Sequence, residues 1–181
     1  MELIEVIKYL SKFPSREGVL KNFKRNTSTM EGYSDLMGYI AALPPAIMPE
    51  IKDFVVGTSE KDISERIRNL DNYFMFLEYG QIMGDYPDRM RIRKVSFNLA
   101  VYICYHDNSR NIDSMEEAII MDNCLQYAIR LAKHMIADDN ELIPHLRFAE
   151  SVLNFSPVEP ALMYQSIGWG LTFKKSNNLE L

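Results

Sequence analysis

The sequence has no long apolar run. In its 181 residues, no uninterrupted apolar stretch approaches the roughly 18 to 20 residues that a membrane-spanning helix requires. The N-terminal segment MELIEVIKYLSKF is amphipathic, and it is too short and too polar for the hydrophobic core of a secretory signal. We therefore expect a protein with no membrane partner that works, or assembles, in a cytoplasm.

Cysteine is scarce, because the chain holds only Cys104 and Cys124. Cys104 falls in a segment that we interpret as a strand, and Cys124 falls in one that we interpret as a helix. Thiols in such segments are commonly buried. Without a secretory signal there is no reason to expect oxidising conditions, so we expect two reduced, structural thiols.

Positive charge is also limited. Lysine and arginine number 20 against 25 aspartate and glutamate residues, so the net charge is −5. Residues 1–25 are net basic, whereas 26–94 and 95–181 are both net acidic. General affinity for nucleic acid requires a basic field, so only local patches remain candidates for binding it. A hydrophobic content of 47% in a chain of this length predicts one globular domain with a sizeable core.

Motifs that mark enzymes are missing. The chain contains no GxGxxG, GxxxxGK[ST], GxSxG, HExxH or CxxC sequence. His106 and Asp107 stand side by side near Ser109, but neighbouring residues of a strand point to opposite faces. They therefore cannot directly form a general base and its orienting carboxylate. We expect no catalytic residue and no cofactor.

Four residues near one helix end are the strongest candidates for a metal site: His134, Asp138, Asp139 and His145. Their spacing matches no recurring metal site. The helix macrodipole favours imidazolium at a helix C-terminus, which gives His134 a sufficient structural reason to be there. We expect no bound metal.

The first 58 residues predict one helix and then an irregular arm. Apolar residues at helical spacing indicate a helix that ends before Pro14. Residues 34–43 are a weaker helix candidate, and the segment LPPAIMPE is extended because Pro44, Pro45 and Pro49 forbid a continuous ladder. A region this long without firm periodicity commonly binds a partner. We therefore divide the chain into a partner-binding arm over 1–58 and an α+β core over 59–181.

The core begins with a helix and a β-hairpin. The segment TSEKDISERIRNL predicts a helix that starts at Ser59. Residues 72–82 are almost continuously apolar, which suits a strand covered on both faces. Residues 95–105 alternate strictly between apolar and other side chains, so they predict a second strand that pairs with the first.

A long helix and two strands complete the predicted fold. Ser114 and Glu117 have capping-box spacing, and apolar residues of the following helix line one face, which should lie on the sheet: Ala118, Met121, Leu125, Ala128, Ile129, Ala132 and Ile136. Residues 146–155 and 167–173 predict the last two strands. Gly168 and Gly170 flank Trp169 in the closing strand, which indicates that another backbone, helix or ligand approaches closely.

Arg89, Arg91 and Arg93 stand two residues apart at the entrance of the second hairpin strand, followed by Lys94. If the strand includes them, a period of two places the three guanidinium groups on one face. Three interpretations remain open: a solvated hairpin end whose charges discourage edge pairing, a surface that binds acidic groups of a neighbouring subunit, or a contact with nucleic-acid phosphate.

The order of elements resembles the tail-terminator and tail-completion proteins of tailed bacteriophages, small α+β proteins that form rings between head, neck and tail tube. The resemblance covers roughly residues 59–175. It is carried by a leading helix, a hairpin with the strand KVSFNLAVYICY, the long helix EEAIIMDNCLQYAIRLAKHMI and the closing strand SIGWGLTF. Residues 15–58 are longer and more broken by proline than the compact family pattern.

The resemblance implies a non-enzymatic structural protein of the virion, assembled in the cytoplasm of a bacterial host. Copies would form a ring that joins the head connector to the tail and surrounds the DNA channel. Partners would be further copies, neighbouring neck, portal-adaptor or tail-tube proteins, and DNA phosphate. A second interpretation is a small cytoplasmic protein-binding module of the immunity or regulatory type, without catalysis, that uses the sheet face around Gly168 and Gly170 as a groove.

Overall fold

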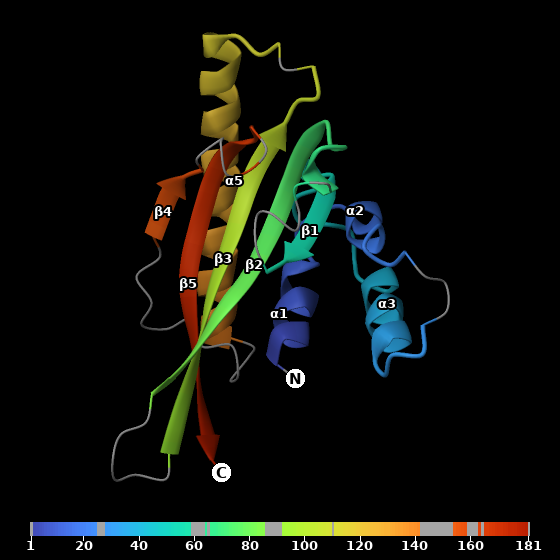
Figure 1. Ribbon diagram of the computed structural model, residues 1–181, viewed down its shortest axis with the longest axis vertical. Helices are drawn as coiled ribbons and strands as arrows, with labels where there is room; N and C mark the ends of the chain where they lie inside the picture. The colour runs from blue at the N-terminus through green and yellow to red at the C-terminus, as the bar shows by residue number, and fades with distance from the viewer. Residues whose placement is uncertain are drawn as a thin grey trace.

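A computed structural model describes residues 2–24, 28–58, 64, 66–85, 92–109, 111–141, 154–158, 163 and 165–180. Within these residues the chain forms a five-stranded sheet, with a long helix against one face and shorter helices beside it (Figure 1). The elements in chain order are α1 (Glu2–Leu10), α2 (Arg16–Leu20), α3 (Tyr33–Ala41), β1 (Asp53–Gly57), β2 (Asn72–Asp85), β3 (Ile92–His106), α5 (Ser114–Glu141), β4 (Asn154–Pro157) and β5 (Ile167–Glu180). The α+β fold class predicted from the sequence is confirmed.

The sheet is mixed, with strand order β1-β2-β3-β5-β4. β2 and β3 form the predicted antiparallel hairpin, in which Tyr73 lies opposite Tyr105 and Leu77 lies opposite Val101. β3 and β4 both pair antiparallel to β5, while β1 runs parallel to β2 at the other side of the sheet. The strictly alternating segment thus becomes the central strand, where both edges find partners.

The body of the sheet is buried on both faces. On one face, a core cluster joins Met75, Leu77 and Val101 of the sheet to Leu131 of α5 and Leu10 of α1. On the other face, a smaller cluster consists of Val55, Ile67, Phe74, Phe76, Cys104, Val158 and Met163. Burial on both faces is what the continuous apolar run of β2 predicts.

The long helix differs from the prediction at its start and in its buried face. The capping box is formed by Asp113 and Glu116: Asp113 Oδ1 accepts from the backbone N–H groups of Met115 and Glu116, and Glu116 Oε2 accepts from the N–H of Asp113. The buried residues are Cys124, Ala128, Leu131, Ala132 and Met135. Ala118, Ile129 and Ile136 of the predicted stripe are exposed. The helix carries apolar residues around much of its circumference, so spacing alone could not select the face.

Residues 2–58 fold against the body of the protein. Val6 and Leu10 of the predicted N-terminal helix are buried, and Ile40 of α3 and Met48 belong to the same core cluster as Leu77 of β2. The weaker helix candidate over 34–43 is confirmed as α3. The sequence did not predict β1, which supplies an edge strand within the expected arm. Residues on both sides of position 58 therefore share one core, and a partner-binding role for the arm stays a prediction.

Part of the predicted structure falls outside the described residues. Of the helix expected over 59–70, the described residues Ser64, Arg66 and Ile67 are helical, and Ile67 is fully buried. Residues 86–91, which connect the hairpin strands, and residues 146–153 of the expected strand are not among those described. The end of that strand is confirmed as β4.

Candidate functional site

Three strands continue well past the body of the sheet. The ladder between β1 and β2 ends at Gly57 opposite Glu78, and the ladder between β4 and β5 ends at Asn154 opposite Thr172. Beyond these pairs the described residues form a three-stranded ribbon, which we call the sheet extension: residues 80–85 of β2, 92–98 of β3 and 173–180 of β5. Figure 1 shows the extension projecting away from the helices, with the C-terminus near its far end.

The sheet extension is a regular ladder with β3 at its centre. Lys94 lies opposite Asp85 of β2 on one side and Asn178 of β5 on the other. The β2–β3 register shifts between Tyr79 and Ile82, where the extension leaves the body. An irregularity of this kind bends a strand and increases its local twist. It therefore sets the direction in which the extension projects.

Two of the four basic residues singled out in the sequence lie on the sheet extension. Arg93 and Lys94 belong to β3, opposite Leu179 and Asn178 of β5. Arg89 and Arg91 fall outside the described residues. The three interpretations of this basic run, as solvated end, subunit contact or phosphate contact, stay predictions.

The glycines of the closing strand are in close contact with β3, as the sequence indicated. A Cβ atom on Gly168 would meet the backbone of Ile103 and Cys104, and one on Gly170 would meet the Tyr102 ring at 2.9 Å. Trp169 donates its indole N–H to the carbonyl of Met121 in α5, at 3.1 Å. The space beside both glycines is thus occupied by the chain's own β3, so it does not form an open groove.

The three prolines of the arm lie exposed on a segment that is anchored on both sides. Pro44, Pro45 and Pro49 are exposed. Between them, the Ile47 carbonyl accepts from Arg130 Nη2 of α5 at 2.7 Å, and Met48 is fully buried. The prolines are therefore presented on a fixed surface of the body.

The structure brings together a basic cleft that the sequence did not predict. The cleft has a volume of about 850 Å³. One wall consists of α2 and the residues that follow it up to Lys24, the other consists of residues 66–70, and β1 forms the floor. Among the described residues, four basic side chains and one acidic side chain line it: Lys21, Lys24, Arg66, Arg68 and Asp53. Apolar contacts come from Phe54, Val55 and Leu70.

The acidic residue among the described lining of the cleft is buried and already paired. Asp53 is 3% exposed. Its Oδ1 lies 2.6 Å from Lys21 Nζ, and its Oδ2 accepts from Asn72 Nδ2 at 2.9 Å. The carboxylate is thus satisfied from both sides and presents little negative charge to the cleft.

Both walls of the cleft are fastened to β1 through backbone carbonyls. Asn22 Nδ2 donates to the carbonyl of Phe54 at 2.7 Å, and Arg66 Nη1 donates to the carbonyl of Val56 at 3.2 Å. Gly18 of α2 packs directly on the backbone of Lys52 and Asp53, where a Cβ atom would not fit. These contacts fix α2 and Arg66 against β1 before any ligand arrives.

The groups considered for catalysis and metal binding do not converge. His106 is buried, with Nδ1 at 3.3 Å from Ser166 Oγ. The Asp107 carboxylate instead accepts hydrogen bonds from the backbone N–H and the hydroxyl of exposed Ser109. His134 packs edge-on against Phe13, and Asp138 accepts from Tyr9, while His145 lies outside the described residues. Among the residues that the structure describes, no three His, Cys, Asp or Glu side chains are grouped to hold a metal ion.

Both cysteines are free and buried, as the sequence predicted. Burial raises the pKa of the Cys104 thiol well above its usual value, and burial raises the pKa of the Cys124 thiol to about 12. A thiol that stays protonated is a poor nucleophile. The two side chains therefore act as small apolar residues of the core.

None of the helices in the described ranges is both long and apolar enough to cross a bilayer. Comparison with known proteins finds no matching family model, no matching curated protein and no matching solved structure.

Proposed function

We propose that this chain is a non-enzymatic structural protein of the tail-terminator type, whose copies form a ring between the head and tail of a bacteriophage. The observation that carries the proposal is the sheet extension, in which 14-residue β2, 15-residue β3 and 14-residue β5 run far past the body. Strands in globular proteins average about 5–6 residues. The extra length lies beyond the last pairs with β1 and β4, so it requires another explanation.

The sheet has short outer strands in the body and longer outer strands in the extension. The body ends in short strands, β1 with five residues and β4 with four, and β4 closes with Pro157. Short edge strands and proline are common devices against unwanted strand pairing. The extension has no such covering strand among the described residues, because β2 past Glu78 and β5 past Thr172 are paired only to β3. Association between copies is thereby directed to the extension.

The two open edges favour head-to-tail association. One edge is contributed by residues 80–85 of β2 and the other by residues 173–180 of β5. They are similar in length and different in sequence. Contact between the β2 edge of one copy and the β5 edge of the next is heterologous, and such contacts generate closed rings when the rotation between copies is suitable. Main-chain pairing at exposed edges is a recurrent mode of association.

The remaining features fit a role at a virion junction. Arg93 and Lys94 lie on the sheet extension, where they would contact acidic groups of a neighbouring copy or phosphate of DNA passing through the ring. Exposed apolar side chains of α5, among them Met115 and Ile119, offer a surface for neck, portal-adaptor or tail-tube proteins. On this proposal the protein works by shape and association, in the virion, without a cofactor.

Light scattering on the full chain and on a chain ended after Thr172 tests the proposal. The full chain is expected to form one oligomeric species of defined size, alone or with neighbouring virion proteins. The shortened chain keeps the β4 ladder and the core but loses the β5 edge, so it is expected to stay monomeric with an unchanged unfolding temperature. A full chain that stays monomeric in both conditions would contradict the proposal.

A further inference from the structure

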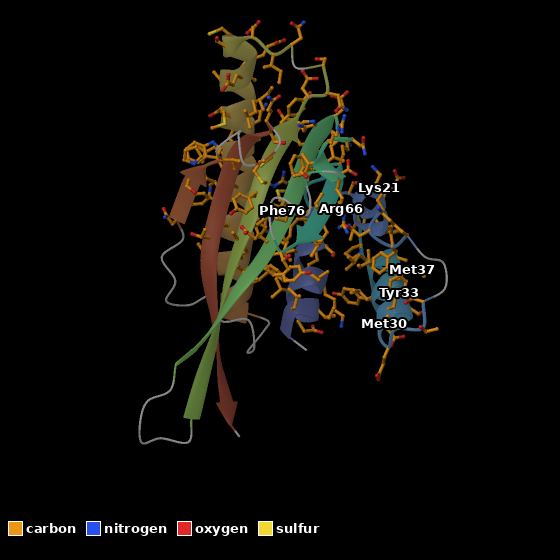
Figure 2. All side chains as sticks on the ribbon, in the orientation of Figure 1. Lys21, Met30, Tyr33, Met37, Arg66 and Phe76 are labelled. Atoms are coloured by element: carbon orange, nitrogen blue, oxygen red, sulfur yellow. The ribbon has the colours of Figure 1, made fainter. Side chains whose placement is uncertain are left out.

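We propose that the basic cleft binds phosphate esters, carried by a nucleotide or by a nucleic-acid strand. This inference is independent of ring formation, because Lys21 and Arg66 lie beside α2 and β1, away from the sheet extension (Figure 2). The net charge of the chain is −5, yet the described lining of the cleft gathers four cationic side chains and one carboxylate. Such a local reversal of sign attracts anions.

Two of the cations are free to bind. Lys21 pairs with Asp53, and Arg66 donates to the Val56 carbonyl. Lys24 and Arg68 line the same cleft, and within the described ranges neither has an acidic partner. A guanidinium fits the geometry of a phosphate group through two parallel hydrogen bonds, and an ammonium adds a point charge.

Lys21 and Arg66, the two cations that already have partners, are fixed in position within the cleft. Asp53 fixes Lys21 at 2.6 Å, and the Val56 carbonyl holds Arg66 at 3.2 Å. Because Asp53 already accepts from Lys21 and Asn72, its charge does not repel an incoming anion strongly. Positively charged groups that are held in place before binding lose less conformational freedom when the ligand arrives.

The size and the floor of the cleft favour a phosphate ester over a free phosphate ion. A volume of about 850 Å³ lies within the usual range for ligand sites, roughly 300–1,000 Å³, and exceeds what one phosphate ion fills. Partly buried Leu70 provides an apolar contact for a sugar or a base beside the nearly buried Phe54 and Val55, and Asn69 lines the same cleft. A simple carboxylate peptide would leave this apolar surface without a specific partner.

Equilibrium binding with three probes tests the inference: pyrophosphate, a nucleoside triphosphate and a single-stranded oligonucleotide of about 12 nucleotides. The test variant is Lys24→Glu with Arg68→Glu, chosen because neither side chain has an acidic partner among the described residues. Lys8→Glu with Lys133→Glu is the matched control, since it makes the same change in net charge outside the cleft, at partly buried Lys8 of α1 and exposed Lys133 of α5. Unfolding temperatures establish that both variants are folded.

The natural chain is expected to bind at least one ester probe, with affinity that falls as salt is added. The Lys24 and Arg68 variant is expected to lose roughly tenfold or more in affinity, and the control to stay within about twofold. Binding of the triphosphate alone identifies a nucleotide as the source, and tight binding of the oligonucleotide alone identifies a nucleic-acid strand.

Equal affinity in the test variant and the control would overturn the inference, and so would failure of every probe to bind. A variant that loses self-association while no probe binds would also overturn it, because the cleft would then receive acidic groups of a second copy. The chain ended after Thr172 retains the cleft, so its binding should persist. Failure of the ring proposal is thereby distinguished from failure of this one.

Discussion

Gly168 of β5 lies opposite Cys104 of β3, so close that a Cβ atom on Gly168 would meet the Cys104 Cα at 2.6 Å. The contact is with backbone atoms, which cannot turn aside as a flexible side chain would. We predict that Gly168→Ala separates the two strands and lowers the free energy of unfolding by about 1–3 kcal/mol. Urea denaturation of the purified variant measures this loss.

Gly38→Ala is the matched control for that substitution. Gly38 lies inside α3, and no atom stands within 4 Å of the position that its Cβ would take. Since alanine favours a helix interior over glycine, this variant is expected to gain up to about 1 kcal/mol in the free energy of unfolding. If Gly168→Ala were as stable as the natural chain, the close approach of β3 and β5 would be wrong.

At the start of α5, mutation can distinguish between two neighbouring candidates for the N-cap residue, Asp113 and Ser114. Asp113 Oδ1 accepts two backbone N–H bonds, at 2.8 Å and 2.9 Å, whereas the sequence favoured Ser114 as the cap. Asp113→Ala is therefore expected to lower the free energy of unfolding by about 1 kcal/mol. Ser114→Ala should change it by less than about 0.5 kcal/mol. The opposite ranking, measured by thermal unfolding, would restore the cap inferred from spacing.

The elements predictable from the sequence were those whose own pattern matches their environment. The segment that becomes β3 alternates because Leu99, Val101 and Ile103 belong to the larger core, whereas Tyr102 and Cys104 belong to the smaller cluster on the other face. The run of β2 is continuously apolar because large apolar side chains are buried on both of its faces. β1 was missed because its short run DFVVG follows the proline-broken segment 43–50. Its strand structure depends on pairing with β2, which local sequence does not reveal.

The candidate sites were harder to predict because they depend on residues far apart in the chain. The tail of β5, KKSNNLE, has no alternating apolar pattern, and it forms a strand by pairing with β3. The basic cleft joins Lys21 and Lys24 to Arg66 and Arg68. The net-basic first 25 residues and the RIR of SERIRNL were the available signals, and neither alone indicates a shared cleft.

Charge reversal on the sheet extension tests the role of its basic residues. We predict that Arg93→Glu with Lys94→Glu weakens self-association about tenfold or more, because carboxylates would replace cations on the surface that we assign to neighbouring copies or DNA. Sedimentation over a range of protein concentrations measures the change. These positions lie beyond the last pairs of β2 with β1 and of β5 with β4, so the unfolding temperature should stay within a few degrees of the natural value.

The control for this charge change is again Lys8→Glu with Lys133→Glu, at partly buried Lys8 and exposed Lys133 of the body. It alters the net charge equally and leaves the sheet extension intact. If both variants associate as the natural chain does, Arg93 and Lys94 belong to a solvated surface. Association would then depend on main-chain pairing at the β2 and β5 edges of the sheet extension, without a contribution from Arg93 and Lys94.

Cross-linking between two singly substituted chains tests the head-to-tail contact most directly. Gly84 of β2 and Asn177 of β5 both lie opposite Val95, so they mark the same level on the two outer edges of the extension. The natural cysteines should not interfere, because both are buried and burial raises their pKa. One preparation carries Gly84→Cys and the other carries Asn177→Cys. On mild oxidation, the mixture is expected to give a disulfide-linked dimer that neither chain gives alone; self-linked dimers of each chain, or no dimer in the mixture, would contradict head-to-tail association through the sheet extension.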